Sequence, residues 1–197
     1  MFEKEYKVFE SEILRGRFQE ISLLGHEYQF FCSHSTNRYH QKGADEFWHI
    51  SSIEPKDCSP NSEIHPCVNT SFESSCCVSS SPTSLREALY PRVPCNFRAD
   101  SIRFIKKALD SLISKEITGL KVWTAPNKQV GRTTIRFYIR KTFEKIDFVT
   151  IFDVRKEKRD VSDGHAFIPL VLVTAFPIEY ASYRKKFDKQ WENGRII

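Results

Sequence analysis

Hydrophobic periodicity is clearest in the second half of the chain, where two helices are predicted. The first begins at Asp100 or Ser101 and ends before Gly119, because apolar residues recur at steps of three and four, at Ile102, Ile105, Leu109, Leu112 and Ile113. The second covers 178–193, where one stripe of aromatic residues contains Tyr180, Tyr183, Phe187 and Trp191. Both patterns indicate helices that bury one face.

Four extended segments separate these helices, at 120–124, 134–141, 147–154 and 170–176. Their short connections favour an antiparallel meander, since parallel pairing needs crossover segments. The last segment is almost wholly apolar and is expected to be central, with Pro169 just before its ladder. The second alternates, so Ile135, Phe137 and Ile139 are expected to face inward, and an open face is expected to carry Thr134, Arg136, Tyr138 and Arg140.

Residues 1–53 alternate over short stretches and predict a small β-rich region, with strands that include 27–32 and 46–53. Residues 54–84 are rich in Ser, Pro, Asn and Cys and indicate a linker or long loop. Residues 85–197 form the predicted basic domain. The expected fold class is therefore α+β: a C-terminal four-stranded antiparallel sheet with helices before and after it, preceded by the β-rich region.

Charge divides unevenly along the chain. Residues 1–95 hold nine Lys or Arg and thirteen Asp or Glu, a formal charge of −4, whereas residues 96–197 hold twenty-one and twelve, a formal charge of +9. Positive potential of this kind favours phosphate backbones, acidic proteins or anionic membranes as partners, and nucleic acid is the partner we expect first. The alternative is that the positive charge only keeps the domain in solution and binds no partner.

The chain start lacks the continuous apolar stretch of a signal peptide, and the longest apolar run, 167–176, is about half a membrane span. We therefore expect a cytoplasmic protein without membrane contact.

Six cysteines fall in the first half, and disulfides are not expected in a reducing compartment. The candidate zinc ligands in this half are Cys32, His34, His40, Cys58, His65, Cys67, Cys76 and Cys77. Their spacing does not suit a tetrahedral site, so no metal or cofactor is expected.

The predicted open face of 134–141 carries two guanidinium groups on either side of a phenol. Successive residues on one face of a strand are about 7 Å apart, so Arg136, Tyr138 and Arg140 suit a phosphodiester backbone with a base stacked nearby. A solvated sheet face, with arginine stems covering apolar surface, explains the same pattern.

The basic four-stranded sheet and its last strand, Leu170-Val-Leu-Val-Thr-Ala-Phe-Pro177, resemble the barnase–EndoU–colicin–RelE group of compact ribonucleases. The resemblance covers about residues 96–192. It implies metal-independent RNA cleavage of the kind carried out by toxins of phages and other mobile elements. An acidic protein that neutralises the domain is a further partner to be considered.

Cleavage through the ribose 2′-hydroxyl needs a proton acceptor, a proton donor and cations near phosphorus. His165 is the only histidine of the basic half and is the expected general acid or base. Arg136 and Arg140 are expected to bind the phosphate, with Arg132 and Lys121 as helpers, and Thr174 is expected to hydrogen-bond a nonbridging oxygen or orient the imidazole. Tyr138 is expected to stack on a base or assist proton transfer.

One departure from the pattern of that group is visible. Several enzymes of the group carry a catalytic histidine on or just after the early helix, where this chain has Arg98, Lys106 and Lys107. Two other functions therefore stay open: a non-catalytic nucleic-acid-binding or regulatory protein of a phage or plasmid, and a module that binds an acidic protein. The absence of Walker A, GxGxxG, HExxH and GxSxG motifs argues against kinase, hydrolase-elbow and metalloprotease functions.

Overall fold

A computed structural model describes residues 3–14, 17–33, 35, 44–54, 92–129, 131–161, 164–194 and 196. The predicted linker, apart from Glu54, lies outside these residues. The elements in chain order are α1 (Glu3–Glu12), β1 (Arg17–Leu23), β2 (His26–Phe31), α2 (Asp45–Ile50), β3 (Ser52–Ile53), β4 (Val93–Pro94), α5 (Asn96–Asp100), α6 (Arg103–Ile113), β5 (Lys121–Gln129), β6 (Arg132–Phe143), β7 (Ile146–Val154), β8 (Lys158–Arg159), β9 (Ala166–Pro177) and α7 (Ala181–Gly194).

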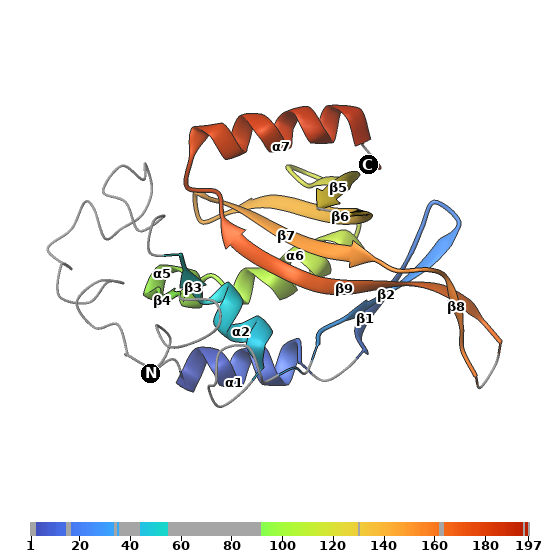
Figure 1. Ribbon diagram of the computed structural model, residues 1–197, viewed down its shortest axis with the longest axis horizontal. Helices are drawn as coiled ribbons and strands as arrows, with labels where there is room; N and C mark the ends of the chain where they lie inside the picture. The colour runs from blue at the N-terminus through green and yellow to red at the C-terminus, as the bar shows by residue number, and fades with distance from the viewer. Residues whose placement is uncertain are drawn as a thin grey trace, which may run out of the picture.

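The main sheet has the strand order β1-β2-β9-β7-β6-β5, with β8 paired to β9 (Figure 1). The four predicted strands correspond to β5, β6, β7 and β9, and they are successive antiparallel neighbours. The sheet is larger than predicted because the antiparallel β1–β2 hairpin adds to the other side of β9, where β2 runs parallel to it. The fold is α+β with a mostly antiparallel sheet, and β9 is central as expected.

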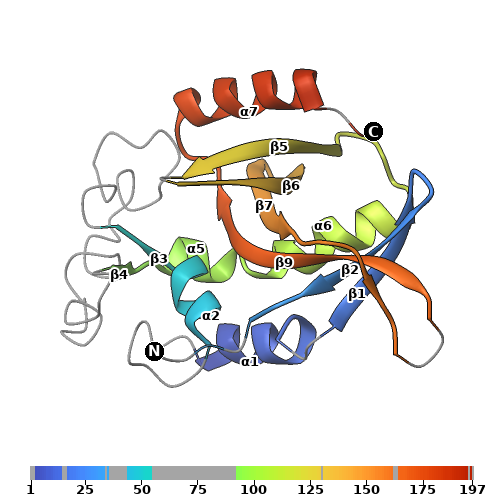
Figure 2. The ribbon, with the colours of Figure 1, turned by 45° about the vertical axis from the view of Figure 1, so that its right-hand side comes forward.

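Helices cover both faces of this sheet (Figures 1 and 2). On one face, α1, α2 and α6 pack in a large core that includes Phe9, Phe47, Phe104, Phe137 and Phe152. On the other face, α7 packs in a smaller core, centred on Trp123, Tyr138, Ile151 and Phe187. Both predicted helices are confirmed as α6 and α7. Residues of the first half share the sheet and the large core with residues of the second half.

Two segments of the first half are helices where strands were predicted. Tyr6 and Phe9 in α1 and Ile13 just after it are spaced three and four residues apart, as on one face of a helix, and Phe9 and Ile13 are buried. In the predicted strand 46–53, only Ser52 and Ile53 are extended, because Phe47 and Ile50 lie one helical turn apart in α2 and both enter the large core. The strand predicted at 27–32 is confirmed as β2.

Pro169 lies inside β9 rather than before it. The strand begins earlier than predicted, at Ala166, because its first residues pair with β8 and β2. The carbonyl of Pro169 accepts a hydrogen bond from the Arg155 N–H at 2.9 Å.

None of the helices in the described ranges combines the length and apolar character needed to cross a bilayer.

Cys32 is the one predicted zinc candidate among the described residues, and burial raises the pKa of its thiol. Within the described ranges, no group of three His, Cys, Asp or Glu side chains is placed to hold a metal ion. The remaining candidates lie outside the described residues: His34, His40, Cys58, His65, Cys67, Cys76 and Cys77.

Gly194 marks a close approach between the end of α7 and β5. A Cβ atom added there would overlap the backbone carbonyl oxygen of Thr124. We expect Gly194→Ala to lower the free energy of unfolding by about 1–3 kcal/mol, because the helix end must move away from the strand. Urea unfolding measures this, with Glu192→Ala, at an exposed site on the same helix, as the control. Equal stabilities of the two variants would contradict the close approach.

Candidate functional site

Helix α7 covers the strand face that the sequence predicted to be open. The Tyr138 ring stacks on Trp123, with ring centroids 4.8 Å apart and planes 4° apart, and Phe187 of α7 lies 6.0 Å from each ring. Tyr138 is only 5% exposed, and burial raises the pKa of its phenol. The predicted open face is wrong at this residue, because the aromatic stripe of α7 packs on it. Tyr138 has no surface for a stacked base.

Arg140 is likewise buried under α7 and bound to carboxylates. Its Nε and Nη2 donate to the two carboxylate oxygens of Asp147, at 2.8 and 2.6 Å, and its Nη1 donates to Asp188 Oδ1 at 3.0 Å. Lys121 Nζ donates to the same Asp188 oxygen at 2.6 Å. Both cations fasten α7 to the sheet through Asp188, so the structure does not present them on an open phosphate-binding surface.

The Asp188 contacts make a testable contribution to stability. The hydrogen bond from Lys121, and then Arg140, lower the pKa of Asp188 below its ordinary value near 3.9. A carboxylate with a lowered folded-state pKa contributes stability above the unfolded pKa and loses it as the pH falls through the folded pKa. We therefore expect Asp188→Asn to be less stable than wild type at pH 7, and the difference to shrink below about pH 4.

Urea unfolding of both proteins at pH 7 and pH 3 measures this difference. The control is Asp110→Asn, because Asp110 pairs with Lys106 on an exposed face of α6 and such pairs contribute little. A stability gap for Asp188→Asn that is the same at both pH values would contradict the proposed ion-pair contribution.

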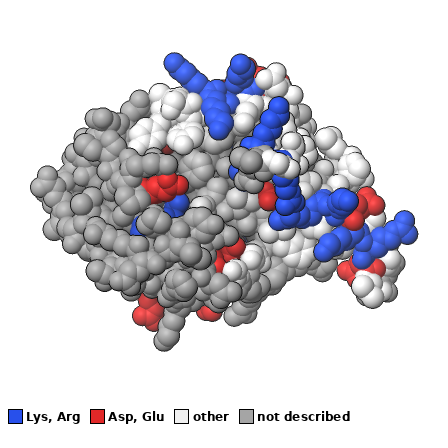
Figure 3. Space-filling model, viewed as in Figure 1, with Lys and Arg blue, Asp and Glu red and all other residues white. Residues whose placement is uncertain are grey.

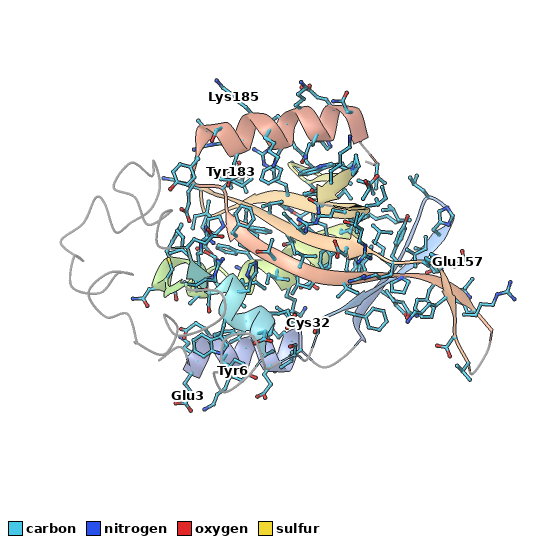
Figure 4. All side chains as sticks on the ribbon, in the orientation of Figure 1. Glu3, Tyr6, Cys32, Glu157, Tyr183 and Lys185 are labelled. Atoms are coloured by element: carbon cyan, nitrogen blue, oxygen red, sulfur yellow. The ribbon has the colours of Figure 1, made fainter. Side chains whose placement is uncertain are left out.

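His165 lies far from the other predicted catalytic residues. It is exposed, just before β9 begins, and its carbonyl accepts the backbone N–H of Asp160. Thr174 is nine residues further along β9, which is about 30 Å at the rise of an extended strand. In Figure 4, Glu157 of the same hairpin and Tyr183 of α7 lie at opposite ends of the sheet. The predicted convergence of His165 with the arginines and Thr174 is wrong, because β9 extends further back than the sequence indicated.

The structure brings Arg136 and Thr174 together. Both line a hollow of about 390 Å³ at the start of α7, on the same sheet face as Tyr138 but beyond the helix. Arg132 is exposed at the start of β6 and does not line this hollow. Other segments complete the walls. His49 comes from α2, Glu54 follows β3, Arg92 precedes β4 and Arg98 comes from α5. The end of β9, the connection after it and the start of α7 supply the rest: Phe176, Pro177, Glu179, Tyr180 and Tyr183.

Two arginines of the hollow hold its walls in place. Arg92 is buried and donates to Ser52 Oγ at 2.8 Å, to the Ser52 carbonyl at 2.6 Å and to the His49 carbonyl at 3.1 Å. Arg98 donates to the Ser52 carbonyl at 3.2 Å, and its Nε lies 3.5 Å from the buried carboxylate of Glu179. The guanidinium of Arg98 also lies 5.6 Å from the centre of the Phe176 ring. These contacts join β3 to the start of α7.

Arg136 has the least engaged guanidinium of the three. Among the described residues its side chain pairs only with Asp153, through Nε at 3.4 Å, and the side chain is 19% exposed. Its two terminal nitrogens are therefore available to an anion that enters the hollow. A guanidinium binds phosphate through paired N–H groups. Arg136 is the residue best placed to hold a phosphate here.

Sequence reasoning missed His49, Tyr180 and Tyr183. His49 was hidden in a segment read as a strand, and the two tyrosines were read as part of the buried stripe of α7. Tyr183 is instead 43% exposed, with its ring 6.3 Å from Phe176 and 6.2 Å from Phe187. No local pattern marks these residues, because the hollow is formed only when α2 and the start of α7 pack beside the end of β9.

Comparison with known proteins gives no match: no family model, no curated protein and no solved structure matches this chain. The likeness to the compact ribonucleases therefore stays a prediction, and the functional argument depends on the geometry of the hollow.

Proposed function

We propose that this protein is a metal-independent endoribonuclease of the cytoplasm and that the hollow at the start of α7 is its active site. One observation supports this most strongly: Arg136 and Thr174, two residues expected at the phosphate, line the same hollow as His49, Tyr180 and Tyr183. A cation, a hydroxyl, an imidazole and phenols are the groups that cleavage through a 2′-hydroxyl uses.

In the proposed reaction, the ribose 2′-oxygen attacks phosphorus and the bond from phosphorus to the 5′-oxygen breaks. His49 accepts the proton of the 2′-hydroxyl, and a phenol of Tyr180 or Tyr183 protonates the leaving 5′-oxygen. Arg136 binds the nonbridging oxygens and stabilises the charge that gathers on them, while Thr174 donates a hydrogen bond to one of them. The products are a 2′,3′-cyclic phosphate and a 5′-hydroxyl.

Incubation of the purified protein with total RNA in EDTA tests the proposal. Discrete fragments that end in 2′,3′-cyclic phosphate are expected. Binding without fragments would favour the non-catalytic nucleic-acid-binding function instead. If the protein neither binds nor cuts RNA at low salt, the proposed function is wrong and recognition of an acidic protein becomes the better account.

His49→Ala should lower the cleavage rate by about 10²–10⁴-fold, the usual loss when a general acid or base is removed. Single-turnover cleavage of a labelled oligoribonucleotide across a range of pH measures the rate and shows whether one limb of the pH profile disappears. His165→Ala should stay close to wild type, because His165 lies at the far end of β9. A large loss in His165→Ala with none in His49→Ala would place the chemistry elsewhere.

A further inference from the structure

A second hollow lies beside β9, where β2 and β8 meet it, and has a volume of about 700 Å³. We call it the β9 groove. Its floor is apolar and includes Phe31, Phe167 and Val171, all partly exposed. Its rim is basic and includes Arg155, Lys156 and Lys158, all exposed. Unlike the two buried cores, the β9 groove has apolar side chains that are accessible to solvent and bordered by cations.

Strand register connects the β9 groove to the proposed active site. Arg136 of β6 is opposite Asp153 of β7, Asp153 is opposite Val171 of β9, and Val171 is opposite Phe31 of β2. Side chains that are opposite one another share a face of the sheet. Two strand spacings separate Arg136 from Val171, about 10 Å. The two hollows are therefore neighbours on one face.

The carboxylate of Asp153 lies between the two sites. One of its oxygens is 3.4 Å from Arg136 Nε, and the other is 3.5 Å from Arg155 Nη2. Arg136 lines the active-site hollow, and Arg155 lines the β9 groove. An RNA backbone with one phosphate at the Arg136 guanidinium would therefore have a neighbouring phosphate near the Arg155 guanidinium.

Helix α7 leaves this part of the sheet face uncovered. Its small core contains residues of β5, β6 and β7, together with Phe176 at the end of β9. Figures 1 and 2 show α7 over β5 and β6, whereas β2 and β8 extend past it. The Phe31 and Phe167 rings lie 6.3 Å apart with a tilt of 34°. Partly exposed aromatic rings beside cations are the usual means of binding unpaired bases and their phosphates.

We propose that the β9 groove binds the single-stranded RNA segment next to the cleaved phosphate. Bases stack on Phe31 and Phe167, and phosphates contact Arg155, Lys156 and Lys158. This inference rests on the proposed function for its place in catalysis. Charge complementarity favours a polyanion even with Glu157 on the rim, and Figure 3 shows Lys and Arg gathered over the end of the molecule that carries β8. The aromatic floor favours bases over acidic side chains.

Fluorescence anisotropy tests the groove separately from cleavage. The probe is a labelled single-stranded 2′-O-methyl RNA of about twelve nucleotides, which lacks the attacking hydroxyl and stays intact. Phe167→Ala should weaken its binding by about 5- to 100-fold, the loss expected when one stacking ring is removed. Phe167→Tyr should bind like wild type, because it keeps a ring. Lys158→Ala should lower the slope of log affinity against log salt by about 0.7, one phosphate contact.

The control for charge is Lys185→Ala, because Lys185 lies on the side of α7 that faces away from the sheet (Figure 4). It should bind the probe nearly as well as wild type. Thermal unfolding checks that each variant folds, and Phe167→Leu, which keeps an apolar side chain but no ring, replaces the alanine variant if that one fails to fold.

The outcomes separate the two proposals. Unchanged probe affinity in Phe167→Ala, with cleavage by wild type intact, overturns the groove and leaves the active site. Loss of affinity in Phe167→Ala without any cleavage by wild type supports the groove as an RNA site and overturns the enzyme. Equal affinity for a duplex of the same length overturns the groove, because paired bases cannot stack on its floor. Equal, Phe167-dependent affinity for a poly-glutamate peptide overturns it in favour of a protein partner.

Discussion

Replacing Arg136 with alanine should lower the rate of RNA cleavage by about 10²–10³-fold, the loss that follows removal of one donor to transition-state charge. Of the arginines that line the hollow, Arg136 makes the fewest polar contacts with the described residues, where its side chain pairs only with Asp153 at 3.4 Å. Its removal should therefore change stability by less than about 1 kcal/mol. Arg136→Lys keeps the charge but not the paired N–H groups, so an intermediate loss is expected.

Single-turnover cleavage of a labelled oligoribonucleotide measures this effect. The matched control is Arg103→Ala, because Arg103 is an exposed arginine of α6 that pairs with Glu144 at 2.9 Å and lies outside the hollow. Arg103→Ala should cut RNA like wild type. If the Arg136 and Arg103 variants cut at the same rate, Arg136 does not act on the transition state.

Tyr138→Ala should lower the free energy of unfolding by about 3–5 kcal/mol, the usual effect of deleting a buried aromatic ring. Its ring stacks on Trp123 and contacts Phe187, so the deletion opens a cavity between the sheet and α7. Tyr138→Phe keeps this packing and should preserve both stability and RNA cleavage. Urea unfolding and the cleavage assay test the two variants together.

A different result would restore the substrate-binding role that the sequence suggested for Tyr138. If Tyr138→Ala is as stable as wild type, the ring does not join α7 to the sheet. If Tyr138→Phe folds but no longer cuts RNA, the phenol takes part in the reaction.

The sequence predicted the four C-terminal strands and both helices beside them because their periodicity is local. It could not show that the outward face of β6 is covered. Tyr138 and Arg140 are polar at their tips, and their partners on that face come from distant parts of the chain: Phe187 and Asp188 lie in α7. In the sequence, a buried polar side chain of this kind cannot be distinguished from a solvated one, because the helix that covers it is distant in the chain.

Long-range pairing also explains why the sheet is larger than predicted. Nothing local in 26–31 indicates that β2 joins β9 in parallel, some 140 residues later in the chain. The sequence could place Arg136 and Thr174 on strands of one sheet, because each is polar and lies in a segment with a clear strand pattern. His49, Tyr180 and Tyr183 could not be placed with them, since they reach the hollow from other elements whose placement depends on tertiary packing.

The most direct test of the active-site assignment is an NMR titration of the full chain with an uncleavable 2′-O-methyl RNA. The account predicts the largest shifts at His49, Thr174 and Tyr183 around the hollow, with further shifts at Phe167 in the β9 groove. Shifts confined to the outer face of α7 near Lys185, or to the β5–β6 turn near Arg132, would contradict it.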